Sequence, residues 1–139
     1  MRQLSEFEGV WQLSRQIEDA RAGLSGHLQG EVRFEQGQGG LIVTERGQLT
    51  YGLGAPLQAE RRYVWRSEAG GIAVFFNDER PFHWFSAEET NARHDCPPDL
   101  YHVQYDFSAW PVWTASWQVT GPRKDYVMTS RYRPGQQAM

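Results

Sequence analysis

Hydrophobic and polar residues alternate along almost the whole chain with a period of two, the pattern that β-strands produce. Clusters of Gly, Pro, Asn and Asp interrupt the alternation about every 8 to 12 residues, as in antiparallel sandwiches and barrels. Short helical turns fit only residues 2–7 and 86–90. We therefore predict an all-β fold, a single antiparallel barrel of about 8–10 strands. The predicted strands are 8–18, 27–35, 41–46, 48–53, 58–66, 71–77, 80–85, 91–95, 100–107, 112–120 and 124–133.

Length and composition narrow the classes of function. A chain of 139 residues is long enough for one buried core, so residues 1–139 are expected to form one domain, with a frayed tail at 134–139. The net charge of −3, without any run of basic residues, argues against binding to nucleic acid. No stretch resembles a membrane span or a secretion signal, and Cys96 is the only cysteine. These features predict a cytoplasmic protein without nucleic-acid or membrane partners.

Three charged residues fall on strand faces that are otherwise apolar. Arg15, Glu45 and Arg61 each alternate with hydrophobic residues, and alternate residues of a barrel strand face the lumen. Because a lone buried charge is costly, these groups should pair with one another or meet water or a charged ligand. One interpretation is a structural Arg–Glu network, or a register shift that turns the charges to solvent. The other leaves one arginine free for an anionic head group, because guanidinium matches carboxylate and phosphate in a bidentate fork.

Aromatic and hydroxyl side chains make up most of the rest of the predicted lumen. The chain contains six Trp, six Tyr and seven Phe, and several of them share strand faces with the three charges. Rings with a few hydroxyl groups suit a pocket for a flat or aliphatic small molecule, and they equally suit a filled core. The candidate ligand-binding residues, besides the charges, are Tyr63, Trp65, Tyr105, Trp117, Tyr126, Ser130 and Tyr132.

A group of histidine and cysteine residues is the candidate for metal binding. His94 and Cys96 lie two residues apart on one strand face, and His83 on a neighbouring strand could join them around Zn²⁺, copper or haem iron. The ligand spacings typical of dedicated zinc sites are missing. We therefore predict no metal and no cofactor, and keep His83 and His94 as candidate contacts of a lumen ligand.

Motifs at the start and in the second half of the chain carry a resemblance to known families. The G-x-W formed by Gly9 and Trp11 is similar to the opening of the lipocalins and their calycin relatives. Over nearly its whole length the chain also resembles an uncharacterised bacterial family of lipocalin-like proteins. This resemblance implies the barrel fold and leaves the function open. Its motifs are F-x-G-x-W-x-L-x-R at 7–15, R-x-F-H at 80–83, H-x-C-x-x-D-x-Y-x-V-x-Y-D-F at 94–107 and G-P-R-K-D-Y at 121–126.

Three hypotheses for the function follow. The leading one is a barrel that binds a small, partly apolar ligand, with Arg15 or Arg61 at its polar end and without catalysis. The first alternative is a lyase or isomerase that resembles the phenolic acid decarboxylases, with Arg61, Tyr63, Glu45 and Tyr126 orienting a carboxylate and transferring a proton. The second is a filled barrel without a ligand, acting through its surface in a homodimer or a larger complex.

Overall fold

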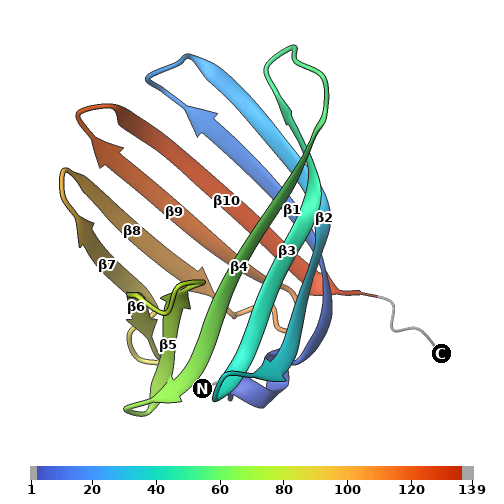
Figure 1. Ribbon diagram of the computed structural model, residues 1–139, viewed down its shortest axis with the longest axis vertical. Coiled ribbons are helices and arrows are strands. Elements are labelled where there is room, and N and C mark those ends of the chain that lie inside the picture. The colour runs from blue at the N-terminus through green and yellow to red at the C-terminus, as the bar shows by residue number, and fades with distance from the viewer. Residues whose placement is uncertain (1–2, 136–139) are drawn as a thin grey trace.

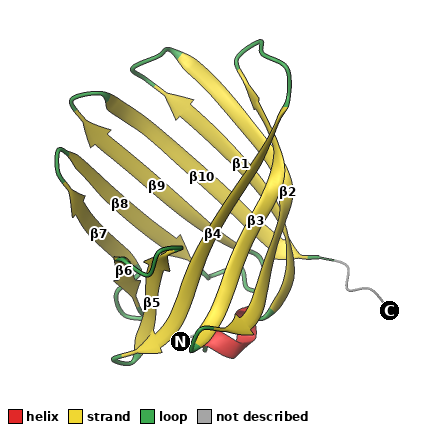
Figure 2. Ribbon diagram, in the orientation of Figure 1, coloured by secondary structure: helices red, strands yellow, loops and turns green. Residues whose placement is uncertain are grey.

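The computed structural model describes residues 3–135, which form one antiparallel sheet of ten strands curled into a barrel (Figure 1). Within that range the only helical element is a 3-10 turn, η1, so the all-β prediction is confirmed (Figure 2). The elements are η1 (Leu4–Phe7), β1 (Gly9–Asp19), β2 (Leu24–Gly37), β3 (Gly40–Tyr51), β4 (Leu57–Glu68), β5 (Gly71–Phe76), β6 (Pro81–Phe85), β7 (Asn91–Cys96), β8 (Asp99–Asp106), β9 (Trp113–Gly121) and β10 (Lys124–Pro134).

The order of the strands explains how the sheet closes. β1 pairs with both β2 and β10, so the first and last strands lie side by side and the sheet continues in either direction to β6 and β7. These two edge strands contact each other, but they form no hydrogen-bonded pair within residues 3–135. The barrel is therefore nearly closed, with one seam between β6 and β7. None of the described helical residues forms a helix long and apolar enough to cross a membrane.

Alternate side chains of the long strands face the lumen, as the period of two predicts. β1 buries Leu13 and Arg15, and β10 buries Ser130 and Tyr132, while the residues between them are more exposed. The register pairs Leu13 with Tyr132 and Arg15 with Ser130 across these two strands. Side chains from strands at opposite ends of the sequence thus meet in one interior.

The predicted strands 41–46 and 48–53 form one continuous strand, β3, instead of two. Gly47 lies directly opposite Gly30 of β2 in the pairing of these strands. A Cβ atom added to Gly30 would lie 2.0 Å from the carbonyl oxygen of Arg46. The glycine pair therefore lets the two strands pass close to each other without breaking the ladder.

The two predicted helical turns had different outcomes. The turn expected within residues 2–7 is present as η1. Residues 86–90 form no helix, although the Ser86 hydroxyl accepts a hydrogen bond from the Glu89 amide at 3.1 Å, as a cap would. The Ser86 amide also donates to the Glu89 carbonyl, so this segment is a tight connection between β6 and β7.

The tail predicted to be frayed at 134–139 begins at the end of the last strand. Pro134 is the last residue of β10, and the Gly135 amide donates to the Val10 carbonyl at 2.9 Å. Pairing with β1 therefore orders the chain up to this point. Residues 136–139 lie outside the described chain.

Aromatic rings fill the lower end of the barrel, where η1 lies in Figure 1. Phe7 is fully buried, with its ring edge-on to Trp65, Trp110 and Trp113 at centre distances of 5.2, 5.2 and 5.3 Å. The Trp11 indole donates to the Phe7 carbonyl at 2.8 Å and fixes the turn against β1. The 3-10 turn thus closes this end with a ring that contacts several strands at once.

Candidate functional site

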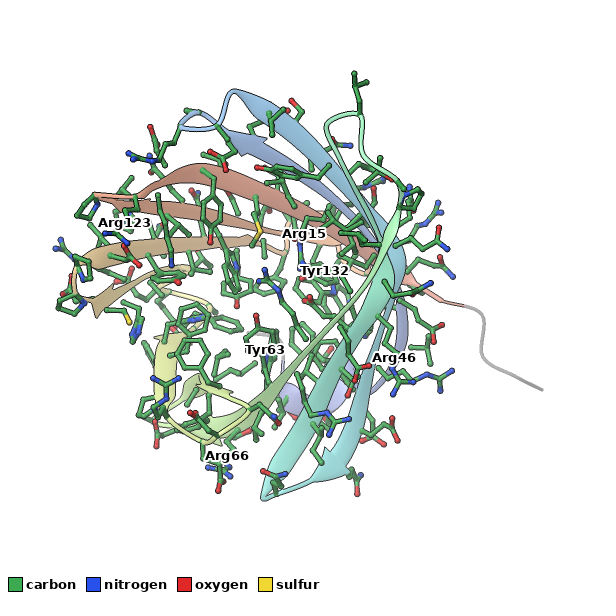
Figure 3. The ribbon with its side chains drawn as sticks, turned by 45° about the horizontal axis from the view of Figure 1, so that its top comes forward. Arg15, Arg46, Tyr63, Arg66, Arg123 and Tyr132 are labelled. Atoms are coloured by element: carbon green, nitrogen blue, oxygen red, sulfur yellow. The ribbon has the colours of Figure 1, made fainter. Side chains whose placement is uncertain are left out.

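The centre of the lumen holds a buried ion pair. Arg15 of β1 donates to both carboxylate oxygens of Glu45 of β3, each at 2.9 Å. Its Nε atom donates to the Ser130 hydroxyl of β10 at 2.7 Å. Arg15 is 3% exposed and Glu45 8%. The Arg–Glu network that the sequence allowed is therefore present, and Figure 3 shows Arg15 inside the ring of strands near Tyr132.

The environment of Arg15 favours its charged form. Burial by itself would lower the pKa of Arg15, but the Glu45 carboxylate raises it, and the net shift is upward. Each nitrogen of the Arg15 guanidinium makes one of these bonds, and its bidentate fork is occupied by Glu45, so an anionic head group could take that fork only by displacing Glu45. Both Glu45 oxygens accept hydrogen bonds from Arg15, so a substrate that used this carboxylate would have to compete with the arginine.

Arg61 lies on the same lumen face but outside this network. It is directly opposite Glu45 in the pairing of β4 with β3, yet the Glu45 carboxylate turns to Arg15. Arg61 is exposed and forms no ion pair with any carboxylate of residues 3–135. Burial raises the pKa of Tyr63 and of Tyr126, and the Arg61 charge partly offsets both shifts. Arg61 is therefore a lumen-facing cation that an anion can reach.

Three of the aromatic residues near Arg61 are only half-buried, unlike those at the lower end, whereas Tyr63 is buried. Tyr101, Trp117 and Tyr126 all keep intermediate exposure. The Trp117 ring centre lies 6.3 Å from that of Tyr63 and 6.3 Å from that of Tyr101. We term Arg61, Tyr63, Tyr101, Trp117 and Tyr126 the upper ring. It combines aromatic faces and hydroxyl groups with one guanidinium that has no carboxylate partner among the described residues.

A small internal cavity lies between the upper ring and the aromatic lower end. Its volume is about 30 Å³, room for about two water molecules. A ligand that reaches this depth must therefore displace side chains. The wall is formed by Val32, Phe34, Val43, Glu45, Tyr63, Trp65, Val74, His83, Tyr105, Trp113, Ala115, Trp117 and Tyr132.

Two polar atoms of residues in this cavity wall lack hydrogen-bond partners. The His83 Nε2 atom lies 2.8 Å from the Tyr105 hydroxyl oxygen. His83 Nδ1 and Trp113 Nε1 are buried and have no partner in the part of the chain that the structure describes. Burial, with a smaller contribution from His94, lowers the pKa of His83 to about 3. The His83 ring is therefore neutral at physiological pH.

His94 and Cys96 do not join His83 in a set of metal ligands. His94 is half-buried at the seam, with ring centres 5.3 Å from Phe82 and 5.9 Å from Tyr101, and Cys96 is exposed. No three His, Cys, Asp or Glu side chains among residues 3–135 are grouped as a metal site requires. The internal cavity is also too small for a porphyrin. Neither the zinc nor the haem alternative gains support from this geometry.

The structure brings most of the predicted site residues to the cavity or the upper ring, and it adds residues that the prediction left out. Trp113 was missing, although the period of two places it on the same face of β9 as Trp117. Phe7 was missing because it comes from a 3-10 turn, where no alternation indicates which way a side chain points. The predicted residues in the cavity wall are Glu45, Tyr63, Trp65, His83, Tyr105, Trp117 and Tyr132.

Comparison with solved structures finds one chain of similar fold over nearly the whole length. The S-type phycobiliprotein lyase CPES from Guillardia theta matches with a TM-score of 0.62 and 8% sequence identity, over 96% of this chain and 92% of that chain. A putative AttH from Nitrosomonas europaea matches at a TM-score of 0.29 and 8% identity, over 88% of this chain and 48% of that chain, too low to support an argument. No curated protein matches the sequence. The profile of a family of unknown function, DUF6314, matches residues 7–134.

Proposed function

Because the chain belongs to the DUF6314 family, whose function is unknown, we propose a function from the site itself: binding of a small, partly apolar anion at the upper end of the lumen. The observation that carries this proposal is Arg61, a lumen-facing guanidinium without a carboxylate partner among the described residues. A guanidinium in this state matches a carboxylate or phosphate. The half-buried rings of Tyr101, Trp117 and Tyr126 supply the aromatic surface that the apolar part of such a ligand needs.

The contrast between the two lumen arginines supports Arg61 over Arg15 as the head-group residue. Arg15 donates to Glu45 and Ser130 with three nitrogen atoms and is almost fully buried. Binding an anion there would break a buried ion pair and leave Glu45 without its partner. Arg61 can bind an anion without such a loss.

The same residues give different support to the enzyme and filled-barrel hypotheses. The likeness to the phycobiliprotein lyase concerns the fold, so it supplies no reaction for this chain. The lyase or isomerase alternative needs Glu45 as a proton donor or acceptor, and Arg15 occupies both of its oxygens. The filled-barrel alternative has one observation in its favour, the small volume of the internal cavity. Action through a homodimer surface and a cytoplasmic location stay predictions.

A matched pair of arginine variants tests the proposal. Arg61→Ala removes the lumen cation, and Arg62→Ala removes the next residue of β4, whose side chain lies 3.9 Å from the Glu60 carboxylate. Decanoate is titrated into each protein and binding is measured by isothermal calorimetry. We expect Arg61→Ala to weaken binding about 10-fold, the effect of losing a hydrogen bond to a charged group, and Arg62→Ala to change it less than about 2-fold.

Equal affinity of both variants and the wild type for decanoate would contradict the role of Arg61. The absence of decanoate binding in all three proteins would favour the filled barrel. Native mass spectrometry of the protein purified from its own host provides an independent check, because a retained small molecule would identify the ligand directly.

A further inference from the structure

The connections at the upper end of the barrel are distinctive in composition. They join β1 to β2, β3 to β4, β7 to β8 and β9 to β10, and Figure 1 shows them at the end of the barrel opposite η1. We term these connections, residues 20–23, 52–56, 97–98 and 122–123, the upper tips. They consist of Gly, Ala, Pro, Leu and Arg alone. Turns that face water ordinarily also use Asn, Asp and Ser, and the upper tips contain none of these residues.

The exposed large hydrophobic side chains gather at the same end. Leu53, in the tip between β3 and β4, is fully exposed, and Leu57 at the start of β4 is mostly exposed. Leu24 and Val127 lie near the starts of β2 and β10, also at the upper end. These four are the exposed large hydrophobic residues of the described chain. Single exposed leucines are ordinary, but their concentration at one end marks an interaction surface.

The charged residues of the upper tips are both cations. Arg21 and Arg123 are exposed, and neither forms an ion pair within residues 3–135. The Arg21 guanidinium donates to the Pro122 carbonyl at 2.9 Å, which holds it beside the turn that carries Arg123. Two guanidinium groups from different hairpins are therefore presented together at the upper end.

The carboxylates closest to the upper tips belong to the strands and not to the tips. Asp19 accepts a hydrogen bond from the Tyr51 hydroxyl at 2.8 Å, and Asp99 forms an ion pair with a lysine at 2.9 Å. Glu18 and Asp125 are exposed, and both alternate with lumen-facing neighbours, so they lie on the outer faces of β1 and β10. A flat surface that approaches the barrel end-on thus meets the arginines of the tips first.

The lower end has the opposite charge. Glu8, Glu68, Glu88 and Glu89 lie in its connections or at the adjoining strand ends, and none of them forms an ion pair within the described chain. The molecule therefore has an electrostatic asymmetry that its modest net charge of −3 conceals. A negatively charged surface attracts the upper tips and repels the lower end, and this favours one orientation.

We propose that the upper tips dock the barrel end-on against the surface of an anionic lipid bilayer. Leu53 projects fully from its loop, and a fluid bilayer admits a projecting side chain without the matching pocket that a protein partner would need. Arg21 and Arg123 then lie at the level of the lipid head groups. The sequence prediction of no membrane partner rested on the lack of a spanning segment, and surface docking needs none.

This inference goes beyond the proposed function and does not rest on it. The two are compatible, because Arg61 also faces the open upper end of the lumen. A partly apolar anion dissolved in the bilayer would then enter the barrel from the docked end. With few leucines and two arginines engaged, the docking is weak and reversible.

Sedimentation with phospholipid vesicles tests the docking of the full chain. The wild-type protein should bind vesicles of phosphatidylcholine and phosphatidylserine more tightly than vesicles of phosphatidylcholine alone, and added salt should weaken the binding. Leu53→Ser should weaken it about 10-fold, the effect of losing one inserted leucine. Because Leu53 is fully exposed, this variant is expected to fold.

Charge variants of opposite sign sharpen the test. Arg123→Gln should weaken binding to the phosphatidylserine vesicles about 5-fold, whereas Asp125→Asn, two residues away, should strengthen it by up to about 5-fold. Arg33→Gln is the matched control for Arg123→Gln. It removes the same charge from an exposed arginine in the lower half of β2 and should change binding less than about 2-fold.

The single cysteine allows the orientation to be measured. Cys96 is exposed next to the tip at 97–98, so a nitrobenzoxadiazole label there should brighten when phosphatidylserine vesicles are added. The control moves the label to the lower end with Cys96→Ser and Ala87→Cys, and this label should not respond, because residue 87 lies in the connection between β6 and β7.

Three outcomes would contradict the docking. Wild-type protein that binds neither kind of vesicle would overturn it, as would binding that Leu53→Ser leaves unchanged. A label at residue 87 that brightens while the label at Cys96 does not would overturn the orientation. In each case the titration of Arg61→Ala with decanoate contains no vesicles, so the proposed function stands or falls separately.

Discussion

The two ends of the lumen are built from similar side chains, yet one is closed and the other is open to solvent. At the lower end Phe7, Phe34 and Trp113 are at most 1% exposed. At the upper end Trp117 and Tyr126, on the same lumen faces, are only half-buried. The 3-10 turn is present at the lower end alone, and Figure 1 shows the strands diverging toward the other end. Aromatic content therefore does not distinguish a core from a site, whereas closure by a further element does.

The lumen charges show the same contrast. Arg15 of β1 bonds to a carboxylate from β3 and a hydroxyl from β10, and it is buried in the interior. Arg61 faces the same lumen from the upper part of β4 and has no carboxylate partner in the described chain. Only the second arrangement leaves a cation for a ligand. Four predictions test this division between structural lumen residues and an available cation.

The largest effect is expected from Glu45→Ala. It leaves the Arg15 charge buried and unpaired, which typically costs about 3–5 kcal/mol of folding free energy. Urea unfolding of the variant and the wild type measures the loss. The double variant Arg15→Met with Glu45→Leu should recover most of it, because no charge is then buried. A loss below about 1 kcal/mol in Glu45→Ala would show that water reaches the ion pair.

Phe7→Ala is expected to destabilise the protein by about 3 kcal/mol, near the lower limit for a buried aromatic residue. The lower limit applies because η1 is a short terminal turn that can partly relax into the space. Thermal and urea unfolding measure the effect. Exposed Leu57 of β4 provides the comparison, since Leu57→Ala should change stability by less than about 0.5 kcal/mol. A small effect of Phe7→Ala would mean that the lower end does not need its aromatic closure.

Acid is expected to destabilise the protein through His83. Its pKa is about 3 in the folded chain against an ordinary value of 6.5, so the unfolded chain binds more protons between these values. The free energy of unfolding therefore falls as the pH is lowered through this window, by roughly 2 kcal/mol from pH 7 to pH 5. Urea unfolding at both pH values should show that His83→Phe loses this part of the pH dependence. His102→Gln, at an exposed histidine, should retain it.

The smallest effect on stability is expected at Arg61. Arg61→Ala should leave the free energy of unfolding within about 0.5 kcal/mol of the wild type, because the exposed guanidinium has no ion-pair partner among residues 3–135. Unfolding in urea without any added ligand measures this value. A loss above about 1 kcal/mol would place Arg61 with Arg15 as a structural residue and remove the contrast between them.

Local alternation determined the class of fold and the inward faces of most strands. Side chains of a strand point to opposite faces in turn, so the period of two identifies the buried face without knowledge of the partners. On this basis Arg15, Glu45 and Arg61 were assigned to the lumen, and the register of the structure agrees for all three. The strand limits near Gly47 and Pro134 were less predictable, because pairing with β2 and β1 extends these strands.

Only the tertiary structure decided which lumen residues pair and which stay available. Glu45 lies opposite Arg61 in the sheet but bonds to Arg15 across the interior, a choice that depends on barrel curvature and side-chain packing. The same holds for the burial of His83 and the exposure of Cys96, and for the approach of Phe7 to rings of several strands. The sequence by itself specified the faces of the strands, because that pattern is local. The three-dimensional closure of the sheet specified the partners, because it brings together residues that are far apart in the chain.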